Sequence, residues 1–270
     1  MPEMPAKTGT YESRGLRLSY QEAGQGEPLL LLHAFPLSGR MWGPQMEALS
    51  GRWRLLAPDL SGFGASEPTP EICRMTDMAA DAAALLDHLA IRRVVVGGLS
   101  MGGYAALAFA ETHPDRLRAL VLAHTRAGAD SPEARDRRLA TARDVLEKGS
   151  GILVDTAAPK LVGATTRSTR PDLLARVAGW VGEAPPQGVA AAQRGMAERP
   201  DRTPILARIA VPTLVVLGEE DELIPPDESR RMAGAIPGAE TVELAECGHL
   251  GNLERPADFN GALADFLSRL

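Results

Sequence analysis

The pentapeptide at residues 98–102 (Gly-Leu-Ser-Met-Gly) constrains the fold of this chain most strongly, because of the segments on either side of it. Residues 93–97 form a short β-branched run typical of a strand, and residues 103–110 are rich in helix-forming side chains. A serine on a tight strand-to-helix turn points its hydroxyl outward, toward a ligand. The flanking glycines allow the strained bend and the close approach of strand and helix. Ser100 is therefore predicted to be a nucleophile.

The rest of the chain alternates between strand-like and helix-like segments. Strands are predicted at residues 11–21, 28–33, 54–59, 117–123, 211–218 and 240–244, several of them continuous apolar runs. Apolar residues at helical spacing predict helices at residues 76–90 and 256–270. This order is typical of a mostly parallel sheet with helices on both faces.

The alternation stops after residue 124, and residues 131–199 contain helical segments and turns without a convincing strand. Ser131 and Pro132 predict the start of a helix there. Because the insertion is too long for a loop, it is interpreted as a helical cap over the carboxyl ends of the strands. We predict a core of residues 1–124 and 201–270 with a cap at residues 125–200. The arginines and alanines of the cap are interpreted as exposed helix surface.

Composition excludes several other classes of protein. The formal net charge of −6 argues against a nucleic-acid partner and against binding to an anionic membrane. No segment approaches the roughly 18 apolar residues of a membrane-spanning helix, and the first residues do not resemble a signal peptide. Two cysteines provide neither a disulfide framework nor a metal cluster. A cytoplasmic protein is expected.

A nucleophilic serine needs a base and an acid that orients the base. His249 is the candidate base because it follows the last predicted strand, where the strand ends form a ligand site. Asp221 is the candidate acid because it follows the strand at 211–218, although Glu219, Glu220 and Glu222 are close competitors. The order serine, acid, histidine is that of one class of hydrolases.

Five motifs together make the chain resemble the α/β-hydrolase superfamily over almost its full length. They are His33-Ala34-Phe35-Pro36, Asp59 with Gly62-x-Gly64-x-Ser66, Gly98-x-Ser100-x-Gly102, Gly218-x-x-Asp221 and Gly248-His249. The segment 35–39 with Trp42 is similar to small bacterial carboxylesterases, enol-lactonases and cofactor-free haloperoxidases. The resemblance implies an eight-stranded, mostly parallel sheet with the cap inserted after the sixth strand. It also implies that the backbone N–H groups of Phe35 and Met101 form an oxyanion hole.

The chain departs from the family pattern at two positions. Ala34 stands where the family usually has glycine, which costs little if its φ is negative. His124 stands where relatives can carry an acid, which favours Asp221 and could place an imidazole in the pocket floor. His124 is either a core histidine or a pocket residue.

Several other side chains have candidate roles. Trp42 and Trp180 are candidates for lining an acyl pocket, although ordinary packing also accounts for Trp180. His33 is predicted to hold the oxyanion loop through backbone hydrogen bonds, and Asp59 to hold the loop after its strand. Cys247 is predicted to be a buried, inert thiol.

The expected activity is hydrolysis of small to medium carboxylic esters through Ser100, His249 and Asp221, without a metal or organic cofactor. A lactonase or a perhydrolase would use the same three residues and differ only in the pocket. A ligand-binding protein with slow turnover is the alternative from another class. The expected partner is thus a small-molecule ester or lactone.

Overall fold

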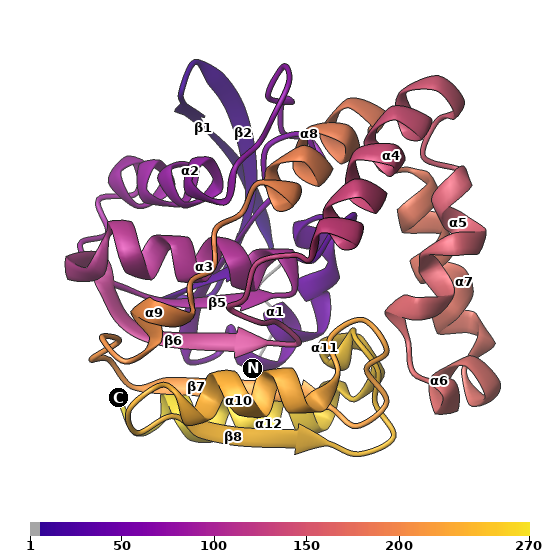
Figure 1. The fold of residues 1–270 in the computed structure, drawn as a ribbon. Coiled ribbons are helices and arrows are strands. Elements are labelled where there is room, and N and C mark those ends of the chain that lie inside the picture. Colours follow the sequence, from indigo (N-terminus) through magenta and orange to yellow (C-terminus); the bar gives the residue numbers. More distant parts are fainter. Residues whose placement is uncertain (1–5) are drawn as a thin grey trace.

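An eight-stranded sheet forms the centre of the computed structural model, which describes residues 6–270 (Figure 1). The strand order is β1-β2-β4-β3-β5-β6-β7-β8, and β2 alone runs opposite to the direction of the other seven strands. The strands are β1 Lys7–Ser13, β2 Leu16–Ala23, β3 Glu27–Leu32, β4 Trp53–Pro58, β5 Val94–Leu99, β6 Leu117–Ala123, β7 Thr213–Gly218 and β8 Glu240–Leu244. The predicted eight-stranded, mostly parallel sheet is confirmed.

The first two strands form a hairpin where the sequence predicted a single strand at residues 11–21. The turn residues Arg14 and Gly15 have φ angles of 50° and 76°, as a tight hairpin turn requires. The guanidinium group of Arg14 donates two hydrogen bonds of 2.8 Å to Asp81 in helix α2 (Met75–His88). This distant carboxylate holds an arginine in a conformation that is more common for glycine.

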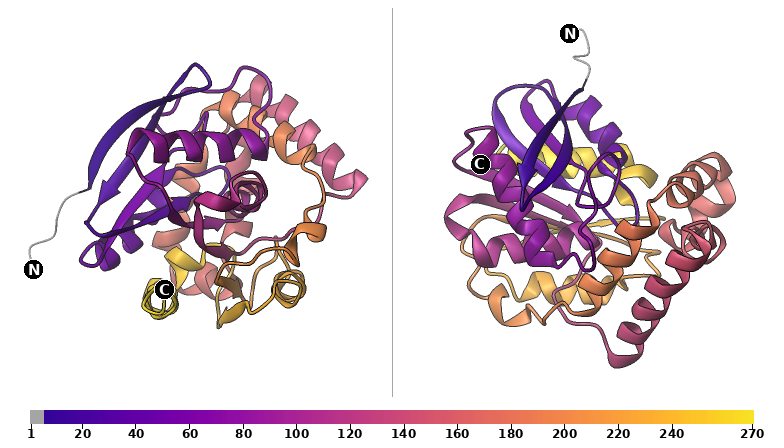
Figure 2. Two further views of the ribbon diagram at one scale, coloured as in Figure 1. Left: turned by 90° about the vertical axis from the view of Figure 1, so that its left-hand side faces the viewer. Right: turned by 90° about the horizontal axis from the view of Figure 1, so that it is seen from above.

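Helices cover both faces of the sheet (Figure 2). Helix α2 packs against α3 (Met101–Thr112), and α1 (Gly43–Leu49) packs against α12 (Pro256–Leu267). The remaining core helices are η1 Gly39–Trp42, η2 Pro114–Arg116, α9 Thr203–Leu206, α10 Pro226–Gly234 and α11 Gly251–Glu254. Among the described residues, none of the helices combines the length and apolar character needed to cross a bilayer.

A helical segment between β6 and β7 lies beyond the carboxyl ends of these strands (Figure 1). It contains α4 Pro132–Lys148, α5 Ile152–Thr156, η3 Ala158–Leu161, α6 Ala164–Thr169, α7 Pro171–Gly182 and α8 Pro186–Ala197. The predicted helix start is confirmed, because the Ser131 hydroxyl caps α4 by accepting a 3.3 Å hydrogen bond from the Ala134 N–H.

Helix α8 docks on the core through direct backbone contact. The Cys73 N–H donates a 3.0 Å hydrogen bond to the Ala191 carbonyl. A Cβ atom at Gly188 would lie 1.8 Å from the Gly62 carbonyl oxygen, and one at Gly195 would lie 1.7 Å from that of Cys73. Only glycine permits this approach, so two glycines on one helix position the segment against the core.

The two helical glycines Gly195 and Gly179 give a matched stability test. We expect Gly195→Ala to lower the free energy of unfolding by about 1–3 kcal/mol, because its methyl group would clash with backbone. Gly179→Ala in α7 meets nothing within 4 Å and should be neutral or stabilising by up to about 1 kcal/mol. Urea denaturation of both variants measures the difference. Equal stability of the two variants would contradict the proposed docking contact.

Candidate active site

Ser100 lies at the turn between β5 and α3 with φ 56° and ψ −112°, a conformation that non-glycine residues rarely adopt. Its N–H donates a 3.0 Å hydrogen bond to the Ala123 carbonyl, and its own carbonyl accepts a 2.9 Å bond from the Thr125 hydroxyl. Both partners come from the end of β6 and the residues after it. The neighbouring strand therefore holds the strained residue from two sides.

The glycines on either side of Ser100 are required by backbone packing. A Cβ atom at Gly98 would lie 2.1 Å from the Gly102 carbonyl oxygen. One at Gly102 would lie 2.1 Å from the Leu32 carbonyl oxygen at the end of β3. The pentapeptide thus brings the start of α3 into contact with β3 and β5, as its sequence predicts.

His249 and Asp221 form a buried hydrogen-bonded pair beside this turn. The Nδ1 atom of His249 lies 2.8 Å from Asp221 Oδ2 and 3.0 Å from Oδ1. Since a carboxylate only accepts hydrogen bonds, Nδ1 carries the proton and neutral His249 has a free lone pair on Nε2. The backbone N–H groups of Leu223 and Ile224 each donate a 2.9 Å bond to Asp221 Oδ1. The carboxylate is thereby fixed in orientation.

Asp221 remains ionised despite its burial. Burial by itself raises the pKa of this carboxyl, but the opposing interaction with His249 and the hydrogen bonds from His124 and His249 lower the pKa well below its ordinary value. The three competing carboxylates have other partners. Glu220 accepts hydrogen bonds from the Thr165 N–H and hydroxyl, Glu222 pairs with Arg167, and Glu219 accepts a bond from the Glu246 N–H.

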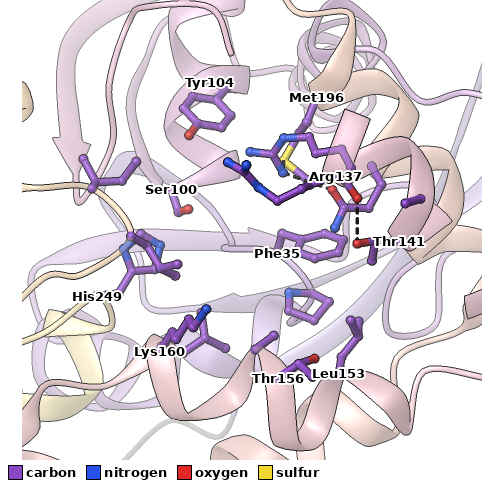
Figure 3. Close-up of a pocket in the computed structure, with 18 of the residues that line it drawn as sticks. Phe35, Ser100, Tyr104, Arg137, Thr141, Leu153, Thr156, Lys160, Met196 and His249 are labelled. Carbon is purple, nitrogen blue, oxygen red and sulfur yellow. Dashed lines mark hydrogen bonds between the residues drawn. The ribbon is translucent and has the colours of Figure 1, made fainter. Parts of the chain in front are cut away.

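Ser100 and His249 line the same cavity of about 550 Å³, and Figure 3 shows their side chains next to each other. No hydrogen bond joins the Ser100 hydroxyl to His249 in this structure. Contacts between a nucleophile and its base are commonly looser before a substrate binds. The arrangement therefore supplies a hydroxyl, a neutral imidazole and an orienting carboxylate in the required order.

His124 contacts Asp221 and does not line the cavity, so the structure does not support an imidazole in the pocket floor. Its side chain is fully buried, with Nδ1 3.3 Å from Asp221 Oδ2. Its Nε2 atom has no hydrogen-bond partner among residues 6–270. A second imidazole thus donates to the same carboxylate oxygen, with its ring centroid 6.0 Å from that of His249.

Among residues 6–270, the candidate metal ligands are the same three side chains, His124, Asp221 and His249. Ligand atoms of His124, Asp221 and His249 lie within 4.8 Å of one another. Both Nδ1 atoms already face the carboxylate at hydrogen-bonding distance. A cation bound there would replace these hydrogen bonds and separate His249 from its acid. The geometry suits proton transfer better than metal binding.

Two backbone N–H groups next to Ser100 or in the cavity lining have no acceptor in the part of the chain that the structure describes. Across residues 6–270, neither the Phe35 nor the Met101 N–H donates a hydrogen bond. Met101 begins α3, so the positive end of the helix dipole adds to its N–H. Phe35 follows Ala34, which is not among the residues with positive φ, so the alanine causes no strain there.

His33 holds the loop that carries Phe35, as predicted, and Asp59 holds both the loop after its own strand, as predicted, and the segment that follows Phe35. His33 Nδ1 donates a 2.9 Å bond to the Ala34 carbonyl, and Nε2 accepts a 3.0 Å bond from the Leu60 N–H. Asp59 accepts 2.8 and 2.9 Å bonds from the N–H groups of Gly39 and Ala65. Burial lowers the pKa of His33 to about 4, so it is neutral at pH 7.

The two tryptophans do not line the cavity that contains Ser100. Trp42 is 1% exposed and packs against Phe259 in the core. Trp180 lines a separate hollow of about 330 Å³, where the guanidinium group of Arg40 lies 5.1 Å from its ring centroid. Hydrophobic packing in the core accounts for Trp42. Trp180 belongs to the separate hollow, where it contacts Arg40.

The basic residues of the cavity were not predicted from the sequence. Arg126, Arg137, Arg138 and Lys160 all line it, although the arginines of this region were interpreted as exposed surface. A usable signal exists, because Arg137, Ala140, Thr141 and Asp144 recur at helical spacing and line the cavity from one face of α4. The helical spacing alone did not show that this face of α4 would line a cavity with Ser100.

The fold and the site together define the class of this protein. The chain belongs to the α/β hydrolase fold family, whose sequence profile matches residues 27–256. It is 39% identical to a thermophilic esterase from Thermogutta terrifontis solved with malate bound, with a TM-score of 0.94 over 98% of this chain and 99% of that one. The enol-lactonase from Burkholderia xenovorans LB400 is 31% identical, with a TM-score of 0.89 over 96% and 100%. The 3-oxoadipate enol-lactonase 2 of Acinetobacter baylyi is 27% identical over 96% of both chains.

The lowered pKa of His33 predicts a specific loss of stability in acid. The unfolded chain takes up this proton near pH 6.5, whereas the folded protein does so only near pH 4. The contribution of His33 is therefore complete above pH 6.5 and is lost progressively as the pH falls from 6.5 through 4, with about 2–3 kcal/mol already lost at pH 4.5. Asp130 and Asp221, whose pKa values are also lowered, lose their contributions below their ordinary value of 3.8.

Urea denaturation at pH 7.5 and 4.5 measures this loss. His33→Gln should reduce it by most of the expected amount, and His88→Gln, an exposed histidine on α2, should leave it unchanged. An undiminished loss in His33→Gln would assign the pH dependence to other groups.

Proposed function

We propose that this α/β hydrolase cleaves small to medium carboxylic esters through Ser100, His249 and Asp221. The observation that carries the proposal is the buried Asp221–His249 pair at a cavity that Ser100 also lines. The relatives support it, since they include an esterase and enol-lactonases. The helical segment would form a cap at residues 125–200 that covers this cavity.

In the first half of the reaction, the Ser100 hydroxyl attacks the ester carbonyl while His249 Nε2 takes up its proton. Asp221 keeps the imidazole in the tautomer with the proton on Nδ1 and stabilises the imidazolium that forms. The Phe35 and Met101 N–H groups bind the oxyanion of the tetrahedral intermediate, each contributing about 3 kcal/mol. The imidazolium then protonates the leaving alcohol, and an acyl-enzyme remains.

In the second half, His249 removes a proton from water, and the resulting hydroxide attacks the acyl carbon. The same N–H groups bind the second oxyanion, and Ser100 leaves with the proton from His249. The products are a carboxylic acid and an alcohol. All proton transfers pass through one imidazole, so its orientation by Asp221 affects both halves.

A lactone is the second candidate substrate, because two of the relatives are enol-lactonases. Opening a cyclic ester uses the same steps, with the alcohol still joined to the acyl group. A perhydrolase would replace water by hydrogen peroxide in the second half. Steady-state rates on ethyl butyrate and γ-butyrolactone, with and without peroxide, distinguish the three reactions. No turnover of either substrate class would favour a ligand-binding protein.

Substitution of Ser100, His249 or Asp221 should abolish most of the ester hydrolysis. Ser100→Ala and His249→Ala should each lower kcat by at least about 10⁴-fold with the fold intact. Asp221→Asn should lower kcat about 10⁴-fold, because an amide donates to Nδ1 and stabilises the wrong tautomer. The measurement is the hydrolysis rate of 4-nitrophenyl butyrate, with circular dichroism to check folding.

Glu220→Gln is the matched control for Asp221→Asn. It changes the adjacent carboxylate, which contacts Thr165 and not His249. Its kcat should stay within about threefold of the wild type. An active Asp221→Asn together with an inactive Glu220→Gln would show that the acid is misassigned.

A further inference from the structure

Two cationic side chains that line the cavity have no anionic partner. Arg137 comes from α4 and Lys160 from η3 (Figure 3). Neither forms an ion pair within residues 6–270, and neither side chain donates a hydrogen bond there. Glu133, one turn before Arg137, accepts a bond from the Ser131 hydroxyl and makes no direct ion pair with Arg137. Both cations are therefore available to a ligand in the cavity that contains Ser100.

The other two cations of the cavity are used differently. Arg126 pairs with Asp130 at 2.8 Å and with Glu228 at 3.1 Å, and Arg138 also contacts Asp130. A third guanidinium group, that of Arg199, lies 2.9 Å from the same Asp130 carboxylate. These arginines hold α4 and α8 to the core. Structural pairing thus accounts for Arg126 and Arg138 but not for Arg137 and Lys160.

The cavity has little negative charge to balance them. Asp144 is its one lining carboxylate among the described residues, and it lies 3.4 Å from Lys148. The cavity is therefore electropositive although the whole chain carries a net charge of −6. An electropositive cleft on an acidic protein attracts small anions in preference to neutral molecules.

We infer that the substrate ester carries a carboxylate, and that Arg137 and Lys160 bind it. The inference rests on the proposed ester hydrolysis and specifies its substrate class. A guanidinium group matches the two oxygens of a carboxylate, and an ammonium group adds a point charge from a second direction. Leu153, Leu161 and Met196 line the same cavity and supply apolar contacts for the carbon chain.

Hydrolysis of such an ester gives a product that carries two acidic groups or an acid and a hydroxyl group. The bound carboxylate stays unchanged. The ester bond breaks, and water supplies the hydroxyl oxygen of the new carboxyl group. If the carboxylate is on the acyl side, the product is a dicarboxylate. If it is on the alcohol side, the product is a hydroxy acid. Both substrate forms belong in the test.

The test compares esters that differ only in charge. Ethyl hydrogen succinate and ethyl butyrate share a four-carbon acyl chain and the same alcohol, and carboxymethyl butyrate places the carboxylate on the alcohol side. Proton release at constant pH gives kcat/KM for each. The wild-type protein should prefer at least one anionic ester over ethyl butyrate, and this preference should weaken as ionic strength rises.

Arg137→Gln and Lys160→Gln should each reduce the preference about three- to fivefold, and the double variant about tenfold or more. The preference is the ratio of kcat/KM for an anionic ester to kcat/KM for ethyl butyrate, so a change that affects all esters equally cancels. Arg143→Gln is the matched control: it is exposed on the same helix, does not line the cavity, and should change neither value. An undiminished preference in the double variant would overturn the inference.

A binding measurement separates this inference from the proposed activity. Ligand-observed NMR titration compares ethyl hydrogen succinate and carboxymethyl butyrate on Ser100→Ala, with and without the Arg137→Gln/Lys160→Gln pair. Weaker binding with the pair supports the anion site even if the wild-type protein hydrolyses no ester, in which case only the proposed activity fails. Equal binding of both anions to the two proteins overturns the anion site and leaves the activity untouched.

Discussion

The strained backbone of Ser100 is the constraint on which the site depends. A φ of 56° in a residue with a Cβ atom costs about 1–3 kcal/mol, and packing must supply that free energy. Contacts of Gly98 and Gly102 with neighbouring backbone supply part of it, and the bonds from Ser100 to Ala123 and Thr125 supply more. The same contacts set the start of α3, whose first residue is Met101. The positions of the Ser100 hydroxyl and of the Met101 N–H, which we propose as an oxyanion donor, thus share one cause.

Asp221 connects the other parts of the site. Its carboxylate accepts hydrogen bonds from two imidazoles and two backbone N–H groups, and these come from the end of β6, from its own loop after β7 and from the loop after β8. A buried carboxylate with this many donors stays charged, and so it can stabilise an imidazolium during turnover. His124 would matter through this carboxylate and not through contact with substrate. Three guanidinium groups surround Asp130 in a comparable way, whereas Arg137 and Lys160 form no ion pair among the described residues.

Sequence patterns predicted those features that depend on local order along the chain. Two predicted strands, at 117–123 and 240–244, match the structure, and so does the helix start at Ser131. Both kinds of prediction succeed because hydrophobic periodicity and helix N-capping are local properties of the sequence. The hairpin was missed because its turn residue Arg14 is held by Asp81, far along the chain. The burial of Trp42 against Phe259 and the convergence of α4 and η3 on one cavity also depend on tertiary packing. Such contacts leave no spacing signature within a single segment.

The central claim is that Ser100 is an activated nucleophile, and covalent labelling tests it most directly. Intact-protein mass is measured after incubation with a fluorophosphonate, for the wild type and for Ser100→Ala. The account predicts one adduct on the wild-type protein and none on the variant, since phosphonylation requires the hydroxyl and its base. An unlabelled wild-type protein, or an equal adduct on Ser100→Ala, would contradict it.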